Sequence, residues 1–144
     1  MSKAFTRDVD DAPPAVVRRR GVPVPTPNPV TAPGLAAARA EHDALARTGG
    51  DPDRLRELGD HLATAQVIPP ENPAAVGVGA RVAVELEDGT RVTYEIVGAI
   101  EADAKHGRVS WQAPLAKALW GAHVGDAVVL PRGAGEVVAL TWLA

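Results

Sequence analysis

The spacing of hydrophobic residues along the chain changes from a helical period to a strand period near residue 76. Before that point, apolar residues recur every three or four positions in two stretches. The first runs through Leu35, Ala38 and Leu45 with His42 on the same stripe, and the second through Leu55, Leu58, Leu62 and Ala65. After residue 76, apolar and polar residues alternate. The chain therefore predicts an α+β fold, with a helical part followed by a β-rich domain.

The two helical stretches predict a short antiparallel hairpin over residues 34–68. Thr31 is suited to cap the first helix, and Gly49-Gly50 to end it. Asp51-Pro52 supplies a cap and a first-turn proline for the second helix. Arms of about 14 residues each reach roughly 21 Å at the rise of an α-helix.

Residues 76–144 predict a compact domain of about five antiparallel strands and one short helix. The strands are expected at 81–87, 91–97, 108–111, 127–130 and 137–142, and the helix at 114–120. Asp88-Gly89 is a strong signal for a hairpin turn. We expect residues 71–75 to be a hinge between the two parts.

Residues 1–33 predict a disordered, proline-rich tail. Seven of the 13 prolines lie in it, most of them in the run VPVPTPNPVTAP. Proline lacks a backbone N–H and favours extended chain, so this run is a poor strand or helix former.

Composition excludes several classes of protein. The net charge of -3 provides no basic field for nucleic acid, and the absence of cysteine excludes disulfides and thiolate metal sites. The sequence contains no phosphate-binding glycine motif and no membrane-length apolar run. We expect a cytoplasmic protein without a cofactor or a membrane partner.

Two charged clusters are candidates for chemistry. Asp51, Asp53 and Glu57 follow the hairpin turn, where carboxylates can help to hold Mg²⁺. They can equally be a helix cap, a dipole partner and a solvated side chain. Glu101, Asp103 and Lys105 form either a charged binding rim or a solvated turn, and their spacing does not decide between these.

From about Val76 to the end, the chain resembles the C-terminal domain of the bacterial Gre transcript-cleavage factors. The matching residues are Gly79-Ala80, the run YEIVG at 94–98, Glu101-Ala102-Asp103, Gly107, Ser110, the run PLAKAL at 114–119 and Val124-Gly125-Asp126. At the other end, residues 1–6 resemble the start of GreB-like proteins.

The resemblance implies an FKBP-like domain that docks at the rim of the secondary channel of RNA polymerase. It also implies a hairpin that points down this channel, where acidic tip residues help to position a catalytic Mg²⁺ and water. The polymerase then cleaves the backtracked RNA.

The hairpin departs from the Gre pattern. The family tip carries a motif of the form GD-x-SEN-x-x-Y, and this chain has ALARTGGDPDRLRELGDHL there, with Gly50-Asp51 as the only remnant. Each helical turn that is removed shortens the reach by about 5.4 Å, and catalysis depends on placement. The plan is closer to the Rnk class, which has a short hairpin.

The leading hypothesis is therefore a non-enzymatic regulator that binds core RNA polymerase at the secondary channel without stimulating cleavage. We expect a monomer that meets nucleic acid only through the transcription complex. The predicted polymerase contacts are Glu101, Asp103, Lys105, Ser110 and Pro114.

Two alternatives remain open. One is a genuine cleavage factor that uses Asp51 and Asp53. The other is a prolyl isomerase-like binding module, which the FKBP-like fold suggests. The four large aromatic residues of the domain, Tyr94, Trp111, Trp120 and Trp142, are scattered in the sequence and do not favour it.

Overall fold

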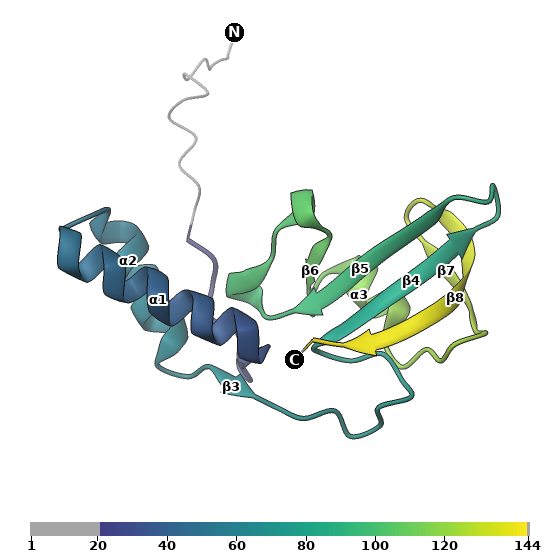
Figure 1. Cartoon of the computed structure of the whole chain (residues 1–144), viewed down its shortest axis with the longest axis horizontal. Coiled ribbons are helices and arrows are strands. Elements are labelled where there is room, and N and C mark those ends of the chain that lie inside the picture. The colour runs from purple at the N-terminus through teal and green to yellow at the C-terminus, as the bar shows by residue number, and fades with distance from the viewer. Residues whose placement is uncertain (1–20, 144) are drawn as a thin grey trace, which may run out of the picture.

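A helical hairpin lies beside a curled β-sheet in the computed structural model, which describes residues 21–143 (Figure 1). Twenty residues of the predicted tail, 1–20, fall outside the described part. The hairpin and the sheet follow each other in the order that the sequence predicts, so the α+β assignment is confirmed. Among residues 21–143, no helix is long and apolar enough to cross a membrane.

The hairpin consists of α1 (Ala32–Thr48) and α2 (Pro52–Leu62). Thr31 caps α1 by accepting a hydrogen bond from the Gly34 N–H at 3.0 Å. Gly49 ends the helix with φ +67°, a conformation that glycine adopts without strain. The predicted caps are thus confirmed, but the arms have 17 and 11 residues instead of equal lengths.

The second helix is shorter than predicted because the chain before α1 packs against its end. The side-chain amide of Asn28 donates hydrogen bonds to the His61 carbonyl and to Thr64 Oγ1, at 2.9 and 3.1 Å. Asn28 thereby satisfies the His61 carbonyl, which would accept a backbone hydrogen bond if the helix continued. The chain then continues as β3 (Gln66–Val67), which pairs in parallel with β2 (Pro29–Val30).

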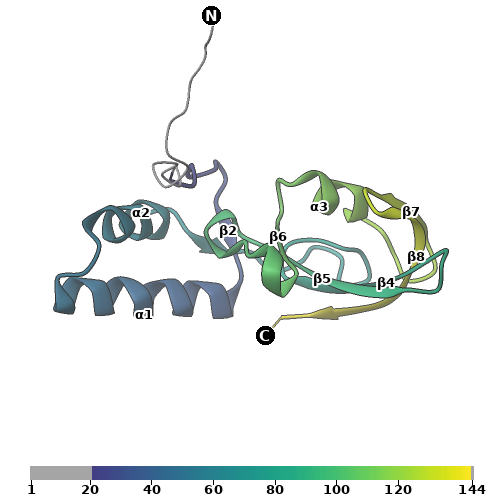
Figure 2. The ribbon, with the colours of Figure 1, turned by 90° about the horizontal axis from the view of Figure 1, so that it is seen from above.

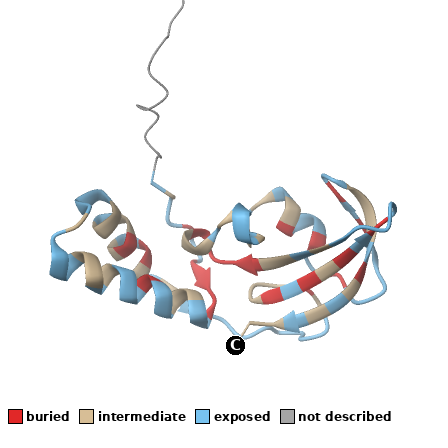
Figure 3. Ribbon diagram, turned by 45° about the horizontal axis from the view of Figure 1, so that its top comes forward, coloured by how far each residue is buried: buried red, intermediate tan, exposed pale blue. Residues whose placement is uncertain are grey.

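This pairing corrects the predicted tail for its last residues. Asn28, Val30 and Thr31 are each at most 4% exposed, so the end of the proline-rich run is a packed part of the hairpin base. Figure 3 shows the buried segment between the hairpin and the sheet. The run VPVPTPNPV contains few backbone donors, and its end is held by the short pairing with β3 and by the side-chain hydrogen bonds of Asn28.

The sheet has five strands in the order β6-β5-β4-β8-β7. Their bounds are β4 (Ala80–Leu86), β5 (Arg91–Val97), β6 (Arg108–Ser110), β7 (Ala127–Leu130) and β8 (Gly133–Trp142). Between β5 and β6 lie two short 3-10 turns, η2 (Ala99–Glu101) and η3 (Ala104–His106). The number of strands agrees with the prediction, and β5 and β7 have the predicted bounds.

The prediction of a fully antiparallel sheet is wrong for one pair. β6 runs parallel to β5, with Glu95 opposite Arg108 and Val97 opposite Ser110. The connector 98–107 between them crosses over instead of turning back, and parallel pairing requires such a crossover. The sheet is therefore mixed, with β6 as one edge strand.

β8 begins four residues earlier than predicted, because three of the residues expected in the connector before it pair with neighbouring strands. Gly133 and Gly135 pair with β7, and Gly135 also pairs with Leu86 of β4. A Cβ at Gly135 would lie 2.8 Å from the Glu85 carbonyl oxygen, so only glycine allows this close approach.

The core of the sheet domain lies between the sheet and α3 (Pro114–Leu119), which covers one face (Figure 2). The inward side of β4 supplies Ala80, Val82, Val84 and Leu86, as the alternation predicts. Leu119 and Ala116 of α3 are fully buried against them. Because Ala116 and Leu119 anchor α3 to the core, Pro114 has a fixed position at the start of this helix.

Candidate functional site

The three carboxylates at the hairpin turn do not converge. Asp51 accepts a hydrogen bond from the Asp53 N–H at 3.0 Å and caps α2. Asp53 is exposed and pairs with Arg56 at 3.4 Å. Glu57 lies one turn further and faces the segment before α1, where it accepts a hydrogen bond from the Val22 N–H at 2.6 Å. Within residues 21–143, no group of three histidine or acidic residues is arranged to hold a metal ion.

Arg54 joins the two arms of the hairpin. Its guanidinium donates to both carboxylate oxygens of Glu41, at 2.8 and 2.9 Å, and to Glu57 at 2.7 Å. The hydrogen bonds from Arg54 lower the pKa of Glu41. Burial raises the pKa of Glu57, but the Val22 N–H and Arg54 together outweigh burial, so the net pKa is lowered. Sequence spacing missed this network because Glu41 and Arg54 lie on different helices.

We expect the stability of the hairpin to fall in acid through these two glutamates. Their folded pKa values lie below the ordinary glutamate value of about 4.3, so their contribution is complete above that pH. It is lost as the pH falls through the folded values. In Arg54→Met, the free energy of unfolding should depend less on pH between about 5 and 3.

Urea unfolding at several pH values measures this effect. Arg56→Met is the matched control, since Arg56 lies on the same helix and its pairing with Asp53 is longer and mostly solvated. Identical pH slopes for the parent protein and Arg54→Met would show that the network contributes nothing.

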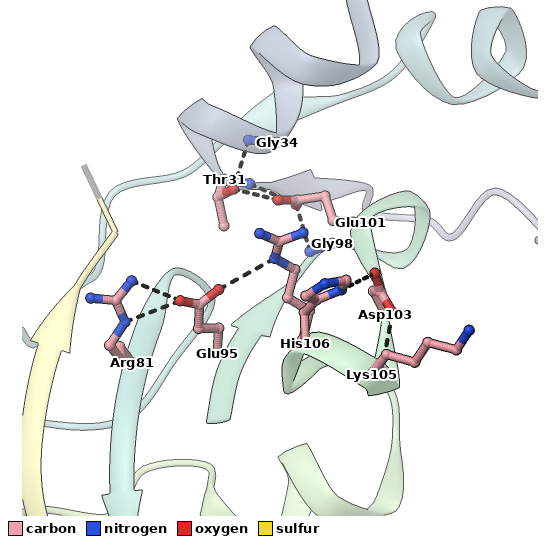
Figure 4. Close-up of polar contacts among 10 residues, drawn as sticks. Thr31, Gly34, Arg81, Glu95, Gly98, Glu101, Asp103, Lys105 and His106 are labelled. Atoms are coloured by element: carbon pink, nitrogen blue, oxygen red, sulfur yellow. Dashed lines mark hydrogen bonds and ion pairs between the residues drawn. The ribbon is translucent and has the colours of Figure 1, made fainter. Parts of the chain in front are cut away.

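Glu101 is turned toward the hairpin. Its carboxylate accepts hydrogen bonds from the Thr31 N–H at 2.9 Å, from the Thr31 hydroxyl, and from the Gly98 N–H at 2.7 Å (Figure 4). All three donors are part of the protein itself. Of the predicted polymerase contacts, Glu101 is thus the one whose carboxylate is bonded to the hairpin part of the chain.

Asp103 and Lys105 lie on the outside of the same connector. Asp103 Oδ2 accepts a hydrogen bond from His106 Nδ1 at 2.6 Å, and this bond lowers the pKa of Asp103. The backbone of Asp103 also pairs with Arg108, which anchors the turn to β6. Lys105 is exposed, and its backbone N–H donates to Asp103 Oδ1 at 3.2 Å (Figure 4).

Ser110 and Pro114 lie at the other end of β6. Ser110 Oγ accepts from the Gln112 N–H at 3.3 Å, and the Ser110 carbonyl accepts from the Ala113 N–H at 2.9 Å, so Ser110 shapes the turn into α3. Pro114 is exposed at the first position of that helix. Four predicted residues therefore lie on or beside one edge strand of three residues: Asp103, Lys105, Ser110 and Pro114. We call them the edge cluster.

A cleft of about 480 Å³ separates the hairpin from the outer face of the sheet. Its charged lining includes Glu95, which accepts two hydrogen bonds from Arg81 at 2.7 and 3.0 Å and pairs with Arg108 at 3.5 Å. These residues come from β4, β5 and β6, and Figure 4 shows the Glu95 carboxylate facing the Arg81 guanidinium. The sequence pattern did not single them out, since only the strand register brings them together.

A second hollow of about 420 Å³ is mainly apolar. It is lined by Trp111, Trp120 and Trp142 together with prolines from residues 27–29 and 69–70. Trp120 is half exposed, and Trp142 Nε1 donates to the Pro73 carbonyl at 2.9 Å. The three tryptophans, which are scattered in the sequence, therefore share one lining. Tyr94 is not among the residues that line it.

Fold and site together define a two-part protein, in which a short helical hairpin is held at its base against a mixed-sheet domain. Residues 71–141 match the family model described as "Transcription elongation factor, GreA/GreB, C-term". The chain is 37% identical over 136 residues to a transcription elongation factor GreA of Verminephrobacter eiseniae, covering 83% of this chain and 85% of the relative. A GreA of Acidiphilium cryptum is 40% identical over 98 residues, which cover 66% of this chain and 62% of the relative.

The chain belongs to the GreA/GreB family of transcription elongation factors. Solved structures of similar proteins include the GreA factor homolog Gfh1 of Thermus thermophilus. It is 26% identical, with 74% of this chain and 84% of that chain covered and a TM-score of 0.44. Another is GreA/GreB of Nitrosomonas europaea, at 23% identity, with 80% and 99% covered and a TM-score of 0.43.

Proposed function

We propose that this protein is a regulator of transcription elongation that binds core RNA polymerase at its secondary channel and does not stimulate transcript cleavage. In this proposal the sheet domain docks, the hairpin enters the channel, and the protein acts without chemistry of its own. Family membership supports the class of partner, and the occupied carboxylates of the hairpin support the absence of cleavage.

The edge cluster is the proposed docking surface. Asp103, Lys105, Ser110 and Pro114 lie on or beside β6, which pairs with β5 along its length and packs Val109 against the core. Charged side chains at a rim steer association and orient a partner, while Pro114 offers a rigid apolar contact. Glu101 is left out of the surface, because its carboxylate is bonded to Thr31 beside the hairpin, whereas the Asp103 carboxylate is bonded only within its own turn.

The geometry of the hairpin is the main support for the proposal that the protein does not stimulate transcript cleavage. At 1.5 Å per residue, the 11 residues of α2 span only about 16 Å. Asp51 is used as a cap, Asp53 pairs with Arg56, and Glu57 faces away from the turn toward Val22. A carboxylate helps to place a metal ion only when it reaches the reacting atoms, so these three residues are poorly placed to do so.

Two assays test the proposal. Binding to core polymerase should be measurable, and Lys105→Glu should weaken it about fivefold to tenfold, as expected for about 1 kcal/mol at an interface. Arg91→Glu is a charge-matched control on the neighbouring strand β5, outside the edge cluster. Backtracked complexes should cleave their RNA no faster with the protein than without it.

Asp51→Asn separates the proposal from a genuine cleavage factor. Asparagine caps a helix about as well as aspartate, so the variant removes the charge and leaves the hairpin intact. Faster cleavage with the parent protein that disappears in Asp51→Asn would overturn the proposal. Absence of any association with core polymerase would overturn the docking half as well.

A prolyl isomerase-like binding module is a second candidate, because three tryptophans line one apolar groove. Aromatic grooves bind proline-containing peptides through their flat faces. A proline-peptide isomerisation assay distinguishes the candidates. Acceleration that is lost in Trp120→Ala would favour the second candidate, and an unchanged rate favours the regulator.

A further inference from the structure

We propose that Glu101 is a positioning residue that holds the hairpin in one orientation on the sheet domain by completing the cap of α1. We call the contact between Glu101, Thr31 and Gly34 the latch. The latch deepens the proposed function, since it determines where the hairpin points from a docked sheet domain. Its geometry is a property of the free protein and is tested there.

A helix N-terminus is often closed by a capping box, in which a threonine cap is paired with a glutamate three residues later. The glutamate accepts a hydrogen bond from the backbone N–H of the cap residue. In α1 the cap is Thr31, but the residue three positions later is Gly34. The helix therefore has one half of the box and lacks the carboxylate.

Glu101 supplies the missing carboxylate from 70 residues away. It accepts a hydrogen bond from the Thr31 N–H at 2.9 Å, as the glutamate of a capping box does. The Thr31 hydroxyl donates to the same carboxylate while it accepts from the Gly34 N–H. The negative charge also lies at the positive end of the α1 dipole. The cap is complete only when the two parts of the protein are docked.

Two glycines make room for this contact. A Cβ at Gly34 would overlap the Glu101 carboxylate. A Cβ at Gly98 would lie 2.5 Å from the Pro29 carbonyl oxygen and 2.8 Å from Val30 Cγ1. The N–H of Gly98 donates to Glu101 at 2.7 Å and orients the carboxylate from its own side. The close approach of hairpin and sheet domain thus depends on glycine at both positions.

Gly34→Ala is the sharpest test, because its two effects have opposite directions. Alanine favours a helix over glycine, so the hairpin itself should gain stability. The added methyl group should nevertheless expel Glu101 and release the hairpin. If the variant instead unfolded the hairpin, the stability of the hairpin would fall and not rise. Gly34→Ala therefore separates a change of hairpin orientation from unfolding of the hairpin.

The distance between two spin labels reports the orientation directly. The chain has no cysteine, so Arg47→Cys on α1 and Glu87→Cys at the sheet hairpin place labels at two unique exposed sites. The parent pair should give one narrow distance population. Gly34→Ala and Glu101→Gln should each add a broad population, with a roughly tenfold shift of the undocked-to-docked ratio for the loss of a charged hydrogen bond.

Matched controls accompany the measurement. Thr31→Ser keeps the hydroxyl and should keep the narrow distance, whereas Thr31→Val should broaden it. Asp103→Asn alters a carboxylate two residues away that contacts His106 instead of the hairpin, and it should leave the distance between the labels in the free protein unchanged. An unchanged distance in both Gly34→Ala and Glu101→Gln would overturn the latch, whatever the protein does at polymerase.

Discussion

Replacement of Leu119 by alanine should lower the free energy of unfolding of the sheet domain by about 2–5 kcal/mol. Leu119 is fully buried and anchors α3 to the core that the inward faces of β4 and β7 form. Removing three carbon atoms there loses transfer free energy and leaves a cavity. Because domains of this size are stable by only about 5–15 kcal/mol, the loss is a large fraction of the total.

Denaturant unfolding followed by tryptophan fluorescence measures this loss, since Trp111 and Trp142 pack against the same core. Lys117→Ala is the matched control. It lies on α3 but is exposed, and a surface change of this kind usually alters stability by less than about 0.5 kcal/mol. Equal stabilities of Leu119→Ala and Lys117→Ala would contradict the placement of α3 on the core.

The second large effect should come from Leu58→Ala, and it should be confined to the hairpin. Leu58 is fully buried in the hairpin, and Val30, Ala38 and His61 are buried in the same part of the chain. None of these four residues belongs to the hydrophobic cluster of the sheet domain. Truncation should cost about 2–5 kcal/mol of hairpin stability.

Hydrogen exchange resolves where the loss occurs. Because Leu58 lies outside the hydrophobic cluster of the sheet domain, amide protection should fall in α1 and α2 and remain in β4 and β8. Arg56→Ala, an exposed change on the same helix, serves as control. A uniform loss of protection along the chain would instead show one cooperative unit and overturn the division into two domains.

The predictions agree with the structure where the interactions join residues close in sequence, and they fail where the interactions join distant residues. The caps Thr31, Gly49 and Asp51 act within a few residues, and each was predicted correctly. The alternation of β4 and β5 is equally local. The direction of β6 was predicted wrongly, because a strand of three residues can pair with β5 in parallel or antiparallel. Only the crossover of the connector 98–107 sets the direction.

The candidate site divides in the same way. Asp51 and Asp53 had local alternatives, as a cap and as a partner of the helix dipole, and the structure places Asp51 at the cap and Asp53 in the first turn of α2. The alternative for Glu57, a solvated side chain, is wrong, because its carboxylate accepts hydrogen bonds from Arg54 and from the Val22 N–H. The role of Glu101 in the cap of α1 could not be predicted from neighbouring residues, since Thr31 and Gly34 lie about half the chain away. The grouping of the three tryptophans is likewise invisible to spacing along the sequence.

By itself, the sequence determined the class of fold, the ends of the first helix, the strand periods and the resemblance to the Gre factors. These depend on backbone capping and on which face of an element is apolar, and both are read within one or two turns of chain. Only the tertiary structure decided that Glu101 completes the cap of α1 and that the end of the proline-rich run is packed. A hydrogen bond across 70 residues exists only after the hairpin and the sheet have met, and no local preference encodes it.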